Sequence, residues 1–241
     1  LWLLLAFSSC RDKDTKTEEV DFQRDLTEIK KSGELVVLTT YGSTSYFDYR
    51  GEWMGYEYEL VHRFALDMGL SVRVEVAEDE SDLTRRLLNG DGDLVAYRLR
   101  ITNERKENLL FAKRNLITKQ VLVQSVSDTM ITDVSELIGK TVWVDGNGKC
   151  FERMNHLNQE LGGGIHIQLS PDSLGIEDLI QMVSEGEIPY TIADDDIALL
   201  NKTYYRNIDC RLPVSFSQRS AWAVRKTSPE LMKAVNEWFD K

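Results

Sequence analysis

Gly33-Glu-Leu-Val-Val-Leu-Thr-Thr40 and Gly92-Asp-Leu-Val-Ala96 are the two stretches of sequence that decide the fold. Each is a short apolar run after a glycine, the pattern of a buried strand, and each is followed by a polar loop. Between them, residues 56–69 carry apolar side chains at helical spacing, residues 72–76 alternate valine with charged residues, and residues 81–88 predict a second helix. This order of elements predicts an α/β fold with a mainly parallel sheet and helices on its faces.

The second half of the chain repeats the alternation of strands and helices after Gln120-Val-Leu-Val-Gln124. Strands are predicted at 141–144, 165–169 and 190–193, and helices at 150–161 and 176–185. A last strand at 220–225 precedes a helix that begins at Ser228-Pro229, with serine as N-cap and proline at the first helical position. The sequence therefore predicts two α/β lobes.

Length and charge limit the classes of function. The chain has 241 residues with 42% hydrophobic content, enough for one large domain or two lobes of roughly 100 residues each. Acidic residues number 40 and basic residues 29, which gives a net charge of −11. Such a surface repels the phosphates of nucleic acids and anionic lipid head groups. The composition argues against nucleic acid as a partner.

The first ten residues resemble the end of an export signal. Residues 1–9 form an apolar run that is too short to span a bilayer. Phe7-Ser-Ser-Cys10 resembles a bacterial lipobox, so Cys10 is the predicted site of lipidation, and residues 11–32 are predicted as a charged tether and lead-in. These features predict a lipoprotein of the bacterial periplasm, expected on the outer membrane. The alternative is an ordinary signal peptide with an incidental cysteine.

The other two cysteines, Cys150 and Cys210, allow two interpretations. In an oxidising compartment a disulfide between them would close a loop of sixty residues and stabilise the fold by roughly 4 kcal/mol. Alternatively, both are buried free thiols. The three histidines of the chain have no metal-ligand spacing, so we predict neither a metal site nor a cofactor.

Six blocks of the sequence resemble, in order and spacing, the family 3 bacterial solute-binding proteins of the polar amino-acid type. They are Gly33-Glu-Leu-Val-Val37, Gly55-Tyr-Glu-Tyr-Glu-Leu60, Asn89-Gly-Asp-Gly-Asp-Leu-Val95, Ile101-Thr-Asn-Glu-Arg105, Leu137-Ile-Gly-Lys-Thr-Val142 and Ser220-Ala-Trp-Ala-Val-Arg-Lys226. The resemblance covers residues 33–241. It implies the two-lobed periplasmic-binding-protein fold of type II, with a ligand held between the lobes.

The resemblance also implies where the lobes begin and end. The first lobe would comprise residues 33–114 and 220–241, and the second would comprise residues 120–214. The chain would cross between them near 115–119 and again near 215–219. Lobes of this kind close around a ligand by hinge motion.

Within that family, Glu57-Tyr-Glu-Leu60, Tyr190-Thr-Ile-Ala-Asp194 and the lipobox resemble the N-terminal sensor domain of the membrane-bound lytic murein transglycosylase F subfamily. The resemblance implies a non-catalytic, ligand-binding domain that recognises peptidoglycan fragments or amino acids, with a catalytic domain beyond Lys241. One alternative is a stand-alone amino-acid-binding lipoprotein that serves an ABC permease. Another is a dehydratase-like enzyme, which needs a cleft carboxylate with a raised pKa; Glu57 and Glu59 are instead expected on a solvated helix face.

Two kinds of charged residue are implied as ligand contacts. Arg105 stands where the family has an arginine that grips a ligand carboxylate, a bidentate task that suits a planar guanidinium. Asp194 or Asp195 would accept the ligand ammonium from the second lobe. A solvated arginine, and aspartates that cap the next helix, are the alternatives.

Aromatic residues and a glycine loop complete the predicted contacts. Tyr41 and Tyr46 lie where family members place an aromatic wall over the ligand, although either could equally be a packing residue. A loop before a predicted helix offers backbone N–H groups to an anion, and its residues are Asp145, Gly146, Asn147 and Gly148.

Arg98 and Arg100 depart from the family pattern, which usually has small or hydroxyl residues at these positions. Together with Arg105, they would crowd a free amino acid. We therefore expect a larger or more anionic ligand, such as a muropeptide with several carboxylates.

Overall fold

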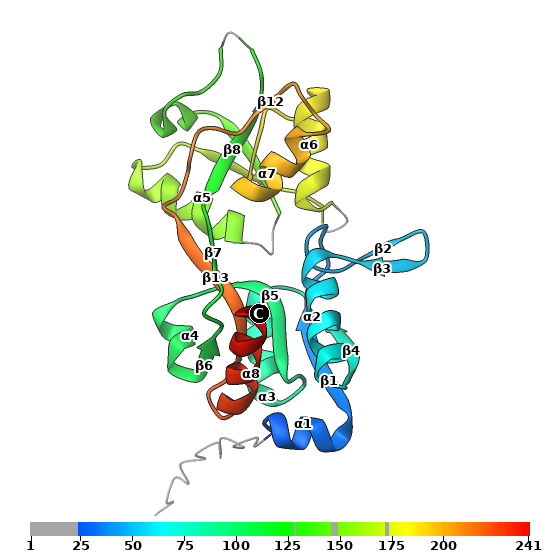
Figure 1. Cartoon of the computed structure of the whole chain (residues 1–241). Helices are drawn as coiled ribbons and strands as arrows, with labels where there is room; N and C mark the ends of the chain where they lie inside the picture. The colour runs from blue at the N-terminus through cyan, green and yellow to red at the C-terminus, as the bar shows by residue number, and fades with distance from the viewer. Residues whose placement is uncertain (1–23, 128, 146–148, 172–173) are drawn as a thin grey trace, which may run out of the picture.

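The computed structural model describes residues 24–127, 129–145, 149–171 and 174–241. These residues form two α/β lobes that lie end to end and are joined by two crossing segments of the chain (Figure 1). The α/β class predicted from the sequence is confirmed. Cys10 and the rest of the predicted signal segment lie outside the described residues, as do Gly146, Asn147 and Gly148.

The first lobe is built on a mixed sheet. Its strand order is β4 (Ser71–Val76), β1 (Glu34–Thr39), β5 (Leu94–Arg100), β13 (Gln218–Arg225) and β6 (Leu109–Phe111), and β7 (Leu116–Thr118) also pairs with β13. Helices α2 (Tyr56–Asp67) and α8 (Pro229–Phe239) pack on one hydrophobic cluster, and α3 (Glu80–Asn89) packs on another. Five of the six β1 residues are buried, as expected for a central strand covered on both faces.

The second lobe repeats this plan. Its sheet order is β10 (His166–Leu169), β9 (Thr141–Val144), β11 (Tyr190–Asp194), β8 (Gln120–Ser125) and β12 (Ile208–Asp209). Helix α5 (Lys149–Glu160) and the 3-10 helix η1 (Val134–Leu137) cover one face, and helices α6 (Ile176–Glu185) and α7 (Asp195–Lys202) cover the other. Neighbouring β8 residues such as Leu122 and Val123 therefore point into different clusters.

Two hydrogen-bonded strands connect the lobes. Thr118 of β7 pairs with Gln218 of β13, and Leu116 pairs with Ser220, in antiparallel register. Because β13 returns from the second lobe, it also runs antiparallel to β5 and β6, whereas β1 runs parallel to β4 and β5. The second sheet is mixed in the same way: β9 runs parallel to β10 and β11, whereas β8 runs antiparallel to β11 and β12.

Residues 24–32, expected in a tether and lead-in, form part of the first lobe. Helix α1 (Leu26–Ser32) buries Ile29 completely. The Asp25 carboxylate accepts hydrogen bonds from Leu26 N at 2.7 Å, Leu231 N at 2.8 Å and Glu230 N at 3.0 Å, so one side chain caps both α1 and α8. Ser228 holds the predicted N-cap position of α8, but its hydroxyl donates to the carbonyl of residue 24.

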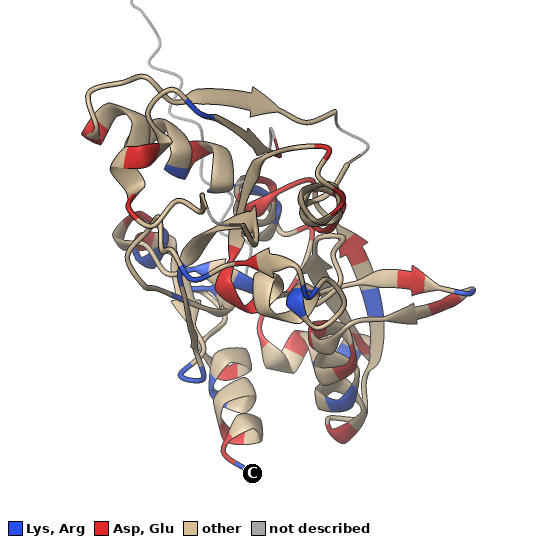
Figure 2. Cartoon of the chain, turned by 90° about the horizontal axis from the view of Figure 1, so that it is seen from above, with Lys and Arg blue, Asp and Glu red and all other residues tan. Residues whose placement is uncertain are grey.

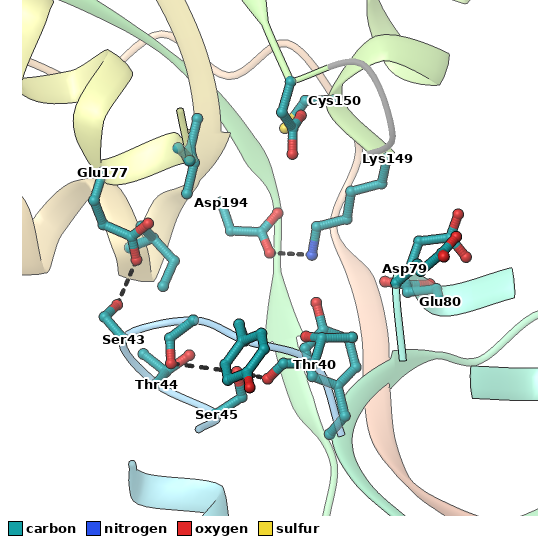
Figure 3. Close-up of a pocket in the computed structure, with 18 of the residues that line it drawn as sticks. Thr40, Ser43, Thr44, Ser45, Asp79, Glu80, Lys149, Cys150, Glu177 and Asp194 are labelled. Atoms are coloured by element: carbon teal, nitrogen blue, oxygen red, sulfur yellow. Dashed lines mark hydrogen bonds and ion pairs between the residues drawn. The ribbon is translucent and has the colours of Figure 1, made fainter. Parts of the chain in front are cut away.

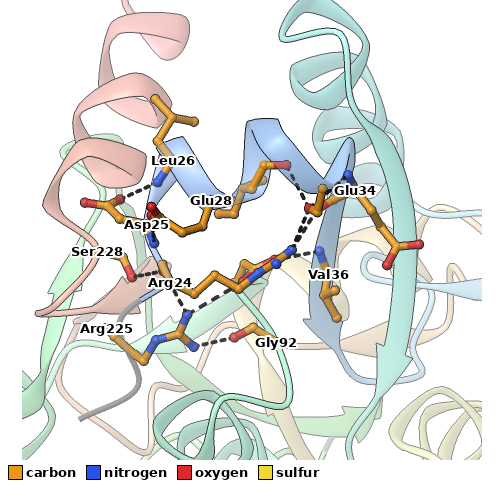
Figure 4. A network of polar contacts seen from close by, with 12 residues as sticks. Arg24, Asp25, Leu26, Glu28, Glu34, Val36, Gly92, Arg225 and Ser228 are labelled. Carbon is orange, nitrogen blue, oxygen red and sulfur yellow. Dashed lines mark hydrogen bonds and ion pairs between the residues drawn. The ribbon is translucent and has the colours of Figure 1, made fainter.

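A buried polar network fastens this segment to the sheet (Figure 4). Arg24 Nε donates to Asp93 Oδ1 at 2.7 Å, and the other Asp93 oxygen accepts from Val36 N at 3.0 Å. Arg225 donates to the carbonyls of Leu87 and Gly92. The network fastens the α1 segment, which is not part of the sheet, to the ends of β1, β5 and β13.

Cys150 and Cys210 are both buried and free, so the disulfide alternative does not hold. Cys150 belongs to the cluster under α5, and Cys210 belongs to the cluster under α6 and α7. These clusters lie on opposite faces of the sheet, which keeps the thiols apart. Burial raises the pKa of the Cys150 thiol, so it is held in the protonated form.

Candidate functional site

A cavity of about 310 Å³ lies between the lobes, and both lobes line it (Figure 3). The first lobe contributes residues 40–45, residues 78–81, Tyr97 and Arg100. The second contributes Asp145, residues 149, 150 and 152, residues 175–177, Asp194 and Ile197. The cavity is large enough for an amino acid or a short peptide segment, but not for a folded partner.

The loop that follows β1 forms one wall of the cavity. Ser45 Oγ donates to Thr40 O at 2.9 Å, and Tyr46 N donates to Gly42 O at 3.1 Å, which closes a tight turn. Gly55, the N-cap residue of α2, packs closely against this turn. It has φ +136°, and a Cβ there would lie 2.3 Å from Ser45 O. Only glycine fits this position, so α2 holds the loop in place.

Carboxylates outnumber cations in the described lining of the cavity. Seven acidic residues line it, namely Glu78, Asp79, Glu80, Asp145, Glu152, Glu177 and Asp194, against Arg100 and Lys149. Helices α3, α5, α6 and α7 begin at the cavity, and each N-terminus adds a positive charge of about 0.5, or roughly 2 in all. The excess of five carboxylates is therefore only partly offset.

Lys149 and Asp194 form an ion pair inside the cavity (Figure 3). Burial opposes the charge on Lys149, but Asp194, Tyr97 and Glu80 outweigh it and raise the pKa of the lysine. Asp194 thus lines the cavity as predicted, but it already faces an ammonium from its own lobe. Lys149 was not among the predicted site residues, although it directly follows the predicted glycine loop.

Asp195 lies outside the cavity lining. Its Oδ1 accepts a hydrogen bond from Lys119 N at 3.3 Å, and its backbone N–H donates to Lys119 O at 2.9 Å. Asp195 therefore ties α7 to the end of the first crossover. Of the two aspartates proposed for the ligand ammonium, only Asp194 is positioned to meet a ligand.

Two arginines contact the same carboxylate oxygen of Glu80. Arg105 Nη1 lies 2.8 Å from Glu80 Oε2, and Arg100 Nε lies 3.0 Å from the same atom. Burial disfavours the charged carboxylate, but Lys149, Arg100 and Arg105 outweigh burial and lower the pKa of Glu80. Arg105 is not among the described lining residues, and its guanidinium contacts Glu80. The structure therefore gives no support to the carboxylate grip expected of Arg105, which stays a prediction.

Two carboxylate oxygens at the cavity are buried and have no hydrogen-bond partner among the described residues. They are Glu80 Oε1 from the first lobe and Asp145 Oδ1 from the second. Burial raises the pKa of Asp145, whereas Lys149, Arg100 and Arg105 together lower the pKa of Glu80. Buried acceptors without a donor are rare in folded proteins.

The two predicted aromatic residues have different positions. Tyr41 lines the cavity and is 66% exposed, whereas Tyr46 is 8% exposed and does not line it. The Tyr46 ring is packed between Tyr41 and Trp53, with Tyr58 5.1 Å away. The turn at Gly42 directs Tyr46 inward, so only Tyr41 is placed where the predicted aromatic wall could meet a ligand, and that contact stays a prediction.

Arg98 and Arg100 point to different places, although strand alternation would put both on one face. The pairing of β5 with β13 is irregular: Leu99 pairs with Ala221, but Val95 pairs with Ala223. Arg100 lines the cavity, whereas Arg98 contacts Glu57 at 3.3 Å and Asp196. Glu57 is buried, not solvated, and also accepts from Trp222 Nε1 at 2.6 Å.

These pairings remove the basis for an anionic ligand. Arg98, Arg100 and Arg105 each face a carboxylate of the chain itself. No surplus of positive charge remains in the described lining, so the pairings give no support to the ligand with several carboxylates, which stays a prediction.

Among the described residues, three polar contacts cross between the lobes beside the cavity. Ser43 Oγ donates to Glu177 Oε1 at 2.5 Å, and Arg100 Nη2 donates to Glu152 Oε2 at 3.2 Å. The third is the ion pair of Arg98 and Asp196. All three join exposed or half-buried groups, so each is worth little alone and the lobes are not locked.

Comparison with known proteins identifies relatives over the whole chain. The sequence profile of the bacterial extracellular solute-binding proteins, family 3, matches residues 34–241. A membrane-bound lytic murein transglycosylase F from Desulfosudis oleivorans is 33% identical over 100% of this chain and 52% of its own length. One from Pseudomonas fluorescens is 30% identical over 99% of this chain and 47% of its own length. The chain thus spans about half the length of these curated relatives.

Solved structures share the fold at low sequence identity. The arginine-bound form of truncated ArgBP from T. maritima has a TM-score of 0.71 and 23% identity, and covers 89% of this chain and 99% of that one. An ancestral arginine-binding protein bound to arginine has a TM-score of 0.71 and 21% identity, covering 86% and 91%. At these identities the likeness establishes the two-lobed fold. None of the helices in the described part of the chain is long and apolar enough to span a bilayer.

Proposed function

Because the chain belongs to the bacterial extracellular solute-binding proteins of family 3, we propose that its cavity binds a small solute with a cationic nitrogen. Suitable ligands are a basic amino acid or a peptidoglycan peptide that carries a free amino group. The chain is a solute-binding domain, and the proposal concerns which solute it takes.

The observation that carries this proposal is the pair of unpartnered oxygens, Glu80 Oε1 and Asp145 Oδ1. An ammonium or guanidinium group donates several hydrogen bonds and carries the charge that the carboxylates lack. The two oxygens come from opposite lobes. A ligand that bonded to both would therefore favour the closed arrangement of the lobes over an open one.

We further propose that this domain is the sensor half of a lytic murein transglycosylase. The support is the match to curated relatives of that name over the full length of this chain, which spans about half of theirs. In this proposal a catalytic domain follows Lys241 and Cys10 carries a lipid anchor to the outer membrane. A stand-alone binding lipoprotein beside an ABC permease remains the alternative, and continuation of the reading frame into a catalytic domain discriminates between them.

Thermal unfolding with a ligand panel tests the choice of solute. The panel contains arginine, lysine, a neutral amino acid, glutamate, and a murein peptide with its amino group free or acetylated. A ligand at 100 times its Kd should stabilise the fold by about 2.7 kcal/mol. We expect stabilisation by the cationic members and loss of the effect on acetylation. Equal stabilisation by glutamate or by the acetylated peptide would show that the acidic cavity does not select the ligand.

Asp145→Asn provides the matched test of the site, because it keeps the shape of the side chain and removes the charge. Glu104→Gln is the control, since Glu104 is an exposed residue of α4 (Asn103–Asn108) outside the cavity lining. We expect Asp145→Asn to lower the affinity for cationic ligands by about tenfold. Glu104→Gln should bind them with the affinity of the wild type.

A further inference from the structure

Two ion pairs cross between the lobes among the described residues, and they differ in burial. Arg98 of β5 in the first lobe pairs with Asp196 of α7 in the second, and their side chains are 18% and 34% exposed. Arg100 pairs with Glu152, and these side chains are 24% and 60% exposed. Solvent and salt screen an ion pair less when its groups are more buried. The pair of Arg98 and Asp196 is therefore the stronger of the two.

Arg98 is held in place by its own lobe. Its Nε lies 3.3 Å from Glu57 Oε1, and the other Glu57 oxygen accepts a hydrogen bond from Trp222 Nε1 at 2.6 Å. Glu57 and Trp222 are each 4% exposed. Because a buried carboxylate already fixes the guanidinium, Arg98 loses little conformational freedom when it meets Asp196. The first lobe thus presents a preformed cation to the second.

The interlobe pair can also be broken at little cost. If the lobes part, Arg98 stays paired with Glu57, so the first lobe keeps no buried charge without a counter-ion. Asp196 is partly exposed and can be hydrated. A partly exposed ion pair of this kind changes an equilibrium constant by up to about fivefold. Such a contact can bias the two lobes toward each other without locking them.

Three successive aspartates at the start of α7 make three different contacts. Asp194 lines the cavity, Asp195 bonds to Lys119 at the end of the first crossover, and Asp196 pairs with Arg98. Figure 2 shows acidic residues on many helices of the chain, so acidic charge alone does not distinguish this run. Its contacts do, because they bring the cavity, the crossover and the interlobe ion pair together within one turn of helix.

We propose that Arg98 is a positioning residue, which favours the closed arrangement of the lobes by pairing with Asp196 and does not contact the solute. Neither residue is among those that the structure places in the cavity lining. The pair therefore favours closure by the same factor whatever solute the cavity holds, and its loss raises the apparent Kd of every solute alike. This inference rests on solute binding between the lobes, as the proposed function does, but not on which solute is selected.

Asp196→Asn tests the inference, because it keeps the size of the side chain and removes the charge that faces Arg98. Calorimetric titration should show a loss of affinity of about fivefold, equal for every solute of the panel that the wild type binds. Asp196→Glu keeps the charge and should restore most of the affinity. Glu187→Gln is the control, since Glu187 is an exposed residue of the second lobe without an ion pair to any residue that the structure describes.

Small-angle X-ray scattering without added solute gives a second readout. We expect a larger mean radius of gyration for Asp196→Asn than for the wild type, because fewer molecules have the lobes together. High salt should remove most of this difference, since it screens the partly exposed pair in the wild type. This measurement does not depend on the identity of the solute.

The results separate this inference from the proposed function. Asp145→Asn should weaken cationic solutes only, whereas Asp196→Asn should weaken all solutes equally. A loss confined to cationic solutes in Asp196→Asn would overturn the inference, because Asp196 would then act as a ligand contact. Affinity and radius of gyration equal to those of the wild type would also overturn it and leave the proposed function standing. If the wild type binds no solute of the panel, the proposed choice of solute fails and the scattering comparison alone decides the inference.

Discussion

Arg105 and Glu80 form a largely buried ion pair, with Nη1 2.8 Å from Oε2 and side chains 12% and 11% exposed. A guanidinium that is expected to hold a ligand carboxylate instead holds a carboxylate of the chain. A ligand carboxylate would have to displace Glu80, and that would leave a buried charge uncompensated. The other oxygen of Glu80, Oε1, has no hydrogen-bond partner among the described residues, and in the proposed function it accepts from a donor group of the ligand.

Glu80→Gln should destabilise the fold by about 3 kcal/mol, because Arg100 and Arg105 both lose a buried anion. Since the pKa of Glu80 is lowered in the folded state, its contribution is present above the ordinary glutamate pKa and is lost as pH falls through the folded value. Denaturant unfolding at neutral pH measures the change. A loss below 0.5 kcal/mol, the size expected for the exposed control Glu104→Gln, would contradict the buried pairing.

Asp145→Asn should have the opposite effect and raise stability by about 1 kcal/mol at neutral pH. The pKa of Asp145 is raised by burial, so the folded state holds its proton longer than the unfolded state does. This residue therefore lowers stability as pH rises above the ordinary aspartate value, and the variant lacks that trend. The difference in unfolding free energy between wild type and variant, followed against pH, isolates the effect. A difference that does not change with pH would show that Asp145 is solvated.

Lys149→Met should make Asp194 available to a ligand. Without ligand the variant should lose about 3 kcal/mol, because the largely buried Asp194 carboxylate loses its counter-ion. A cationic ligand can supply the missing charge, so the rise in unfolding temperature on ligand addition should exceed that of wild type. Lys140→Met is the control, since Lys140 is exposed and has no ion pair with any residue that the structure describes. An equal ligand effect in both variants would mean that the ligand does not approach Asp194.

Asp25→Ala should destabilise the first lobe by about 2 kcal/mol, since one carboxylate caps two helices. Asp240→Ala, at the exposed end of α8, should change stability by less than 0.5 kcal/mol. Hydrogen exchange should show faster opening of both α1 and α8 in the first variant. Faster exchange in only one of these helices would contradict the shared cap.

Local patterns predicted most of the regular structure. The apolar run in β1 and the helical spacing in α6 are signals within a few residues, and both elements appear where they were predicted. The irregular pairing of β5 could not be predicted, because it depends on β13, which is more than a hundred residues away. That irregularity separates Arg98 from Arg100 and so decides which arginine meets the cavity.

The candidate site was harder to predict for a related reason. Four of the predicted residues line the cavity, namely Tyr41, Arg100, Asp145 and Asp194. Arg105 does not line it, because its guanidinium pairs with Glu80. Glu80 has no motif of its own: it is one acidic residue at the start of α3, and its role follows from the two arginines that fold around it. The roles of Lys149 and Glu177 likewise come from tertiary contacts.

The polar network of Arg24, Asp25 and Arg225 places the start of the described chain and its last helix on the same lobe. Any anchor before residue 24 and any domain after Lys241 would therefore both attach to the first lobe. The second lobe would then be the only part free to swing. If the second lobe closed on a solute, its movement would reach neighbouring parts of the molecule through the surface of that lobe, and not by tension along the chain.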